Sequence, residues 1–147
     1  MGGGTRSAPI DAAFLRRCLA TLEHALSALG RCDPDNIEYD IFRAACVKEF
    51  ELVLEQSGKL LRKRLAHYFA SNRQADRLAF KDLFRHAARH GLIAPEACER
   101  WLAYRDTRNE TAHDYGEVLA ETTLELLPAF VVDAGDLADM IEEGGGG

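Results

Sequence analysis

The sequence predicts an all-α protein that folds as an antiparallel, up-and-down bundle of about five helices. Long segments carry apolar residues at three- and four-residue steps, the spacing of one face of an amphipathic helix. No segment shows the sustained alternation of apolar and polar residues that is typical of a strand. The four prolines lie beside these segments or interrupt the last one, which leaves long stretches uninterrupted. Short connections between long helices favour antiparallel neighbours.

The first two predicted helices span residues 11–29 and 37–70. The first carries a single apolar stripe, and Asp11 can cap its start. The second follows a short polar turn at residues 33–36 that can also cap it. Gly58 lies in its middle, where a glycine costs about 1 kcal/mol relative to alanine. We therefore expect a close helix contact or a bend at Gly58.

The remaining helices follow in the second half of the chain. A third helix is predicted over residues 74–90, and Pro95 starts a fourth that ends somewhere in the segment 108–115. A fifth helix begins directly after that segment. Pro128 is expected to interrupt it, which leaves a last helical piece over residues 129–141.

The composition predicts one domain over residues 10–143, between disordered ends at residues 1–9 and 144–147. No run of 18 apolar residues exists, so no membrane span is expected, and the N-terminal residues lack the apolar core of a secretory signal. No two of the four cysteines form a Cys-x-x-Cys pair. Cys18, Cys46 and Cys98 lie in apolar helical patterns and are expected to be buried thiols in a reducing cytoplasm, with no metal site and no cofactor.

The net charge of −6 hides a strong asymmetry along the chain. Residues 1–58 carry a net charge of −3, residues 59–108 carry +7 and residues 109–147 carry −10. A basic middle segment attracts phosphate, whereas an acidic tail repels it. This pattern excludes a protein that coats nucleic acid along its whole length, and it permits local contact with RNA.

A row of basic residues falls at four-residue steps in the predicted third helix, where it would form a stripe along one face. Such a stripe can follow RNA phosphates or bind an acidic partner. It can equally be a solvated helix face, and the sequence leaves both interpretations open. The residues are Arg73, Arg77, Lys81, Arg85 and Arg89.

The polar segment 108–115 is the strongest candidate for a functional site. It lies between the apolar anchors Trp101 and Val118. Arg108 and His113 are five residues apart, which is about 140° around an ideal helix. A site that uses both residues needs the helix to end or bend between them, or a second chain to complete it.

The residue types in this segment are sufficient for RNA cleavage without a metal. Histidine transfers a proton near neutral pH, and arginine holds a phosphate with two parallel hydrogen bonds. Asn109 can orient either group. The 2′-hydroxyl would attack its own phosphate, with His113 handling a proton and Arg108 stabilising charge on the phosphate oxygens. The alternative is structural: Arg108 and His113 would cap a helix end and pair with Glu or Asp.

The pattern Arg108-Asn109-x-x-x-His113-x-Tyr115 resembles the signature of HEPN-domain proteins. It is most similar to the nucleotidyltransferase substrate-binding family, found beside a small MNT-type nucleotidyltransferase in bacteria and archaea. The resemblance extends to the helical layout around the motif and covers about residues 12–141.

This resemblance implies an antiparallel helical bundle that forms a homodimer, with two motifs facing each other. Some members are ribonuclease toxins, which assigns Arg108 and His113 as the catalytic pair and Asn109 as their support. In those systems the nucleotidyltransferase acts as antitoxin by adding AMP to the motif tyrosine, here Tyr115. The resemblance therefore implies a metal-independent RNase toxin of a HEPN/MNT toxin–antitoxin pair.

Two other functions remain open. Some family members are described only as substrate-binding or regulatory partners of the transferase, so a non-catalytic subunit is an alternative. An unrelated helical adaptor is a third. For Tyr115 itself, the structural alternative is a half-buried core tyrosine.

Overall fold

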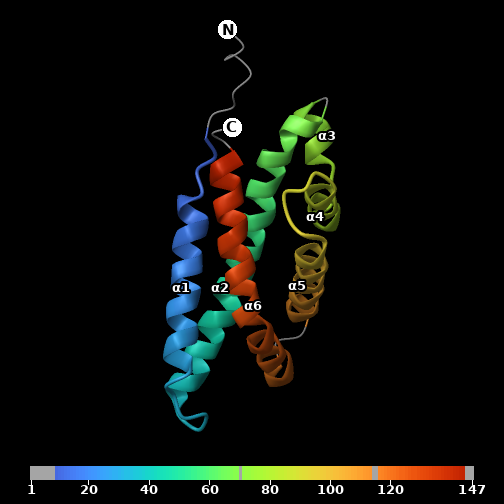
Figure 1. Ribbon diagram of the computed structural model, residues 1–147. Coiled ribbons are helices and arrows are strands. Elements are labelled where there is room, and N and C mark those ends of the chain that lie inside the picture. The colour runs from blue at the N-terminus through green and yellow to red at the C-terminus, as the bar shows by residue number, and fades with distance from the viewer. Residues whose placement is uncertain (1–8, 70, 114–115, 145–147) are drawn as a thin grey trace.

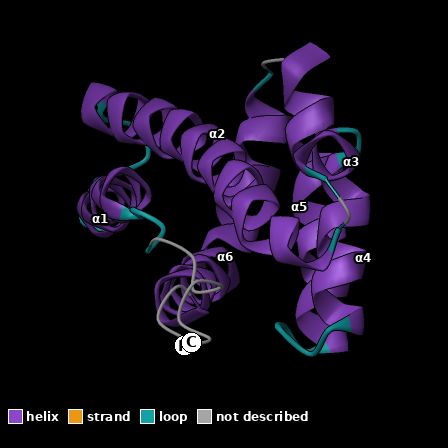
Figure 2. Ribbon diagram, turned by 90° about the horizontal axis from the view of Figure 1, so that it is seen from above, coloured by secondary structure: helices purple, strands orange, loops and turns teal. Residues whose placement is uncertain are grey.

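The computed structural model describes residues 9–69, 71–113 and 116–144, and within these ranges the chain forms helices and no strand (Figure 2). The predicted all-α class is therefore confirmed. Six α-helices and one short 3-10 helix, η2, are present in the described ranges. They are α1 (Ala13–Leu29), α2 (Ile37–Leu65), η2 (Ala66–Tyr68), α3 (Asn72–Asp76), α4 (Phe80–Arg89), α5 (Pro95–His113) and α6 (Glu117–Gly144).

Helix α2 is the central element of the bundle. It contacts α1, α3, α4, α5 and α6. Figure 1 shows α1 and α6 on one side of it, with α3, α4 and α5 on the other. In this view the chain runs up α2, whereas α5 is foreshortened because it crosses α2 instead of lying along it. Ion pairs place the C-terminal part of α5, where the polar motif begins, against the middle of α2.

Aromatic side chains fill the core between α2, α4, α5 and α6. Trp101, Phe50, Phe84 and Phe130 are all fully buried. The Trp101 ring stacks on Phe84 with 4.6 Å between ring centroids, and Phe130 meets Phe50 edge-on at 4.8 Å. Aromatic pairs of this kind contribute beyond their buried area. Because Trp101 lies two turns before Arg108, this cluster fixes α5 in place.

Local sequence signals set several helix ends as predicted. The Asn36 side chain accepts a hydrogen bond from the Glu38 backbone N–H at 3.0 Å, which caps α2. Asp11 accepts one from the Ala13 N–H at 2.8 Å before α1. The chain leaves α4 through Gly91, whose φ of 72° lies in the left-handed region that glycine adopts at low cost.

Of the two features expected at Gly58, a close contact or a bend, the structure shows the close contact. A Cβ built on this residue would lie 2.8 Å from two ring carbons of Phe80. That separation is well inside van der Waals contact, so only glycine lets the Phe80 ring lie against the backbone of α2. The contact fixes the start of α4 against the C-terminal third of α2.

The second and third helices differ from the prediction. Helix α2 ends at Leu65 and not at residue 70, and the short helix η2 follows it. The chain then becomes extended at Phe69, whose ring lies 5.2 Å from the ring of His86. The predicted helix over residues 74–90 is instead two helices, α3 and α4. Between them, Arg62 donates hydrogen bonds from Nη1 to the carbonyl oxygens of Ala75 at 2.6 Å and Leu78 at 2.9 Å. These bonds satisfy carbonyls that a continuous helix would use internally.

The expected interruption at Pro128 is also wrong, because Pro128 lies inside a continuous α6. Leu127 and Phe130 on either side of it are fully buried. Their packing outweighs the cost of the hydrogen bond that proline cannot make, about 3 kcal/mol. Figure 1 shows that α6 changes direction after its first turns, as expected of a helix that contains proline.

Candidate functional site

The described part of the motif, residues 108–113, lies on an unbroken helix. The backbone of α5 is helical from Pro95 to His113, so the break expected between Arg108 and His113 does not occur. On a continuous helix these two positions point about 140° apart. Asn109 is exposed on α5, whereas Tyr115 and the side chain of His113 lie outside the described residues.

Arg108 forms an ion pair with Glu51 across the α2–α5 interface. The distance from Arg108 Nε to Glu51 Oε2 is 3.3 Å, and the two side chains are only 26% and 16% exposed. One turn earlier on α5, Arg105 pairs with the more exposed Glu55 at 3.1 Å. The two pairs lie one turn apart on each of the two helices. Glu51 is a site residue that was not predicted from the sequence, although its four-residue spacing from Glu55 places both on one face of α2.

A cavity of about 470 Å³ adjoins this pair, between α2 and the first turns of α6. Glu51 forms part of its wall, and Gly116, which follows Tyr115 in the chain, forms another part. Val47 and Leu119 contribute apolar surface, and the cations of the wall are Arg43 and Lys48. The ion-pair partner of Arg108 and the residue that follows the motif therefore line a cavity large enough to admit part of a ligand.

The far wall of the cavity is held by a charged network. Arg43 donates to Glu121 at 2.9 Å and also lies near Asp40 and Glu117. Tyr39 donates its hydroxyl to Glu121 at 2.8 Å. Arg43 and then Tyr39 hold the pKa of the Glu121 carboxyl below its usual value. These contacts fix the start of α6 against the start of α2.

A buried polar network attaches α5 to α6 behind the motif. Asp133 is 5% exposed and accepts two hydrogen bonds from Arg100 at 2.8 and 2.9 Å. It also accepts one from the Tyr104 hydroxyl at 2.6 Å. Burial, followed by the hydrogen bond to Asp133, raises the pKa of Tyr104. The network is far better suited to holding α5 in register than to proton transfer near neutral pH.

The basic residues predicted as one stripe are divided between two helices and the turn between them. Arg73 lies in α3, and Arg77 follows it. Lys81 and Arg85 lie in α4, where they pair with Asp106 at 2.6 Å and with Asp82 at 3.0 Å. The expected continuous stripe is therefore wrong, because Arg62 and Phe80 break the helix that would carry it.

The described part of the chain contains no group of three or more His, Cys, Asp or Glu side chains placed to hold a metal ion. The described cysteines form no disulfide. None of the described helices is both long enough and apolar enough to cross a membrane.

Comparisons with known proteins agree with this architecture. The family described as "Nucleotidyltransferase substrate binding protein like" matches residues 12–143. The chain is 30% identical over 108 residues to the probable ribonuclease HepT of Haemophilus influenzae, an alignment that covers 74% of this chain and 73% of that protein.

A solved structure from Haemophilus influenzae also has the same fold. That structure is described as revealing the fold of a substrate-binding domain of a nucleotidyltransferase. It matches with a TM-score of 0.78 and 26% sequence identity, over 89% of this chain and 98% of the other. The family match and the shared helical fold together show that this protein belongs to the nucleotidyltransferase substrate-binding protein family.

Proposed function

We propose that this protein is a metal-independent RNase toxin of a HEPN/MNT toxin–antitoxin pair, acting on RNA in the cytoplasm. The observation that carries the proposal is the half-buried Arg108, which Glu51 holds beside a cavity. The similarity to a probable ribonuclease supports the same activity. A partner nucleotidyltransferase would silence the protein by transferring AMP to Tyr115.

The proposed reaction needs one cation and two proton transfers. The 2′-hydroxyl oxygen of RNA forms a bond to the adjacent phosphorus while the bond to the 5′-oxygen breaks. His113 accepts the 2′-hydroxyl proton, and a second histidine gives a proton to the leaving 5′-oxygen. Arg108 stabilises the negative charge on the phosphate oxygens, and Asn109 orients the reacting groups. The products are a 2′,3′-cyclic phosphate and a 5′-hydroxyl.

We further propose that two chains complete this site as a homodimer. Because α5 is continuous, one chain presents positions 108 and 113 about 140° apart, so a partner chain must supply part of the site. Large apolar side chains on the helices that border the cavity support such an interface. Ile37, Ile41 and Val118 are 69%, 58% and 80% exposed.

A second candidate function is a non-catalytic subunit that binds a nucleotidyltransferase and presents its substrate. The description of the solved structure with a TM-score of 0.78 favours it, because that protein is described as a substrate-binding domain. In this case the protein would bind the transferase without cleaving RNA.

RNA cleavage in EDTA separates the two functions. Purified wild-type protein is expected to cut RNA in EDTA, and His113→Ala is expected to lose the activity because the proton-transfer group is gone. Intact mass should be measured on the same samples, and inactive preparations should carry one or more added AMP units. If unmodified wild-type protein leaves every RNA intact, the toxin is excluded and the transferase-binding subunit is favoured.

Glu51 is expected to act as a positioning residue for Arg108. Glu51→Gln removes the charge that holds the guanidinium, so we expect kcat to fall about tenfold to a hundredfold while KM changes little. Glu55→Gln, which removes the equivalent charge one turn away, should leave kcat unchanged. Equal losses in the two variants would show that the α2–α5 ion pairs serve only stability.

A further inference from the structure

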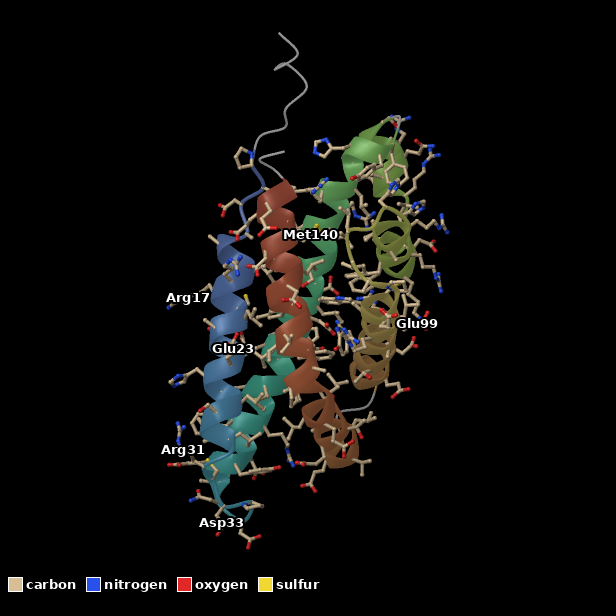
Figure 3. All side chains as sticks on the ribbon, in the orientation of Figure 1. Arg17, Glu23, Arg31, Asp33, Glu99 and Met140 are labelled. Atoms are coloured by element: carbon tan, nitrogen blue, oxygen red, sulfur yellow. The ribbon has the colours of Figure 1, made fainter. Side chains whose placement is uncertain are left out.

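The end of the bundle formed by α3 and the adjoining parts of α2 and α4 is strongly basic. Residues 59–90 contain nine Lys and Arg but only two Asp. Figure 3 shows nitrogen-tipped side chains gathered around this end of the molecule. Arg62, Lys81 and Arg85 are used in internal contacts. The exposed cations, which we call the basic end, are Lys59, Lys63, Arg73, Arg77 and Arg89.

An exposed stack of rings lies within the basic end. The Tyr68 ring is parallel to the His90 ring, with 3.9 Å between centroids and 16° between planes. The Arg64 guanidinium lies 5.9 Å from the Tyr68 centroid. Tyr68 is 42% exposed, and His90 is exposed too. These rings are therefore accessible to a ligand, unlike the buried aromatic cluster around Trp101.

Single-stranded RNA matches both features of this surface. Its bases stack on aromatic and arginine side chains without strict sequence preference, and its phosphates pair with surrounding cations. The carboxylates of an acidic protein partner would pair with the cations, but they would not stack on the exposed rings. The combination of rings and cations therefore favours RNA.

The position of the basic end fits a strand that also reaches the motif. Glu51 and Lys63 lie on the same helix, twelve residues apart, which corresponds to about 18 Å. A few nucleotides of an extended strand cover that distance. Contacts at the basic end can therefore hold RNA without touching the scissile phosphate.

We propose that the basic end is a second RNA-binding surface, where a single strand stacks on Tyr68 and His90 and places its phosphates on Lys63, Arg73 and Arg89. This inference rests on the proposed RNase function and names how the substrate is held outside the reacting site. It predicts that affinity for RNA and the rate of cleavage depend on different parts of the molecule.

Binding should be measured with the full chain and a fluorescent 2′-O-methyl oligonucleotide, which the proposed reaction cannot cut. The double variant Lys63→Glu/Arg89→Glu is expected to bind about tenfold or more weakly. The slope of log Kd against log salt should fall in magnitude by about 1.4, the value for two lost phosphate contacts. The matched control, Arg17→Glu/Arg31→Glu, makes the same change in net charge on exposed residues of α1 and of the turn that follows it (Figure 3), and it should bind like wild type.

The ring stack is tested separately. Tyr68→Ala is expected to weaken binding about fivefold or more, and Tyr68→Phe, which keeps the ring, should restore it. Thermal unfolding of each variant distinguishes lost binding from lost folding.

Equal losses of RNA affinity in the two charge-reversal variants, or no loss in either, would overturn the proposed binding surface. Binding to an acidic polypeptide but not to the oligonucleotide would overturn it in favour of an acidic protein partner. If wild type binds this RNA through the basic end but cuts no natural RNA, the proposed nuclease fails and the binding surface stands. If wild type cuts RNA and the Lys63/Arg89 variant binds normally, the nuclease stands and the surface fails.

Discussion

Arg108→Ala is expected to lower kcat for RNA cleavage by a factor of about a hundred to a thousand. The estimate follows from losing one donor that stabilises charge in the transition state. Arg108→Lys keeps a positive charge but loses the planar pair of donors, so it should restore only part of the rate. Cleavage is best followed under single-turnover conditions in EDTA, where product release does not limit the rate.

Arg105→Ala is the matched control for this experiment. Arg105 lies one turn before Arg108 on α5, is similarly exposed, and pairs with a glutamate on the same face of α2. It differs in stacking over the Phe80 ring at 4.9 Å, away from the cavity. We expect Arg105→Ala to reduce stability slightly and to leave kcat near wild type. If the two alanine variants lose the same activity, Arg108 has no special role and the proposed assignment is wrong.

Trp101→Ala is expected to have the largest effect on stability, lowering the free energy of unfolding by about 3–5 kcal/mol. Trp101 is 1% exposed, and its ring contacts the rings of Phe84 on α4, Tyr104 on α5 and Phe130 on α6. The loss would be a large fraction of the total for a domain of this size, about 5–15 kcal/mol.

Urea unfolding followed by circular dichroism measures this effect, because Trp101 is the only tryptophan and the variant has no indole fluorescence. Val132→Ala is the control, since Val132 is 60% exposed on α6 and its loss should change stability by less than about 0.5 kcal/mol. A Trp101→Ala protein as stable as the Val132→Ala protein would contradict the packing described for α5.

Local patterns were sufficient to predict the helical class, the caps at Asp11 and in the turn 33–36, and a close contact or a bend at Gly58. Each depends on residues that are neighbours in the chain or on the intrinsic preference of one residue type. The segment 108–115 was likewise recognised from residue types and spacing, and its resemblance to the nucleotidyltransferase substrate-binding family agrees with the family match over residues 12–143.

The sequence by itself therefore determined that this is a helical member of that family and which segment carries the candidate site. Only the tertiary structure decided that Arg62 and Phe80 split the third helix, that α6 continues through Pro128, and that Glu51 is the partner of Arg108. These outcomes depend on contacts between residues distant in the chain, whose burial and hydrogen bonding override local helix propensity. A periodic pattern specifies which face of a helix is apolar, but it does not specify which neighbour that face will meet.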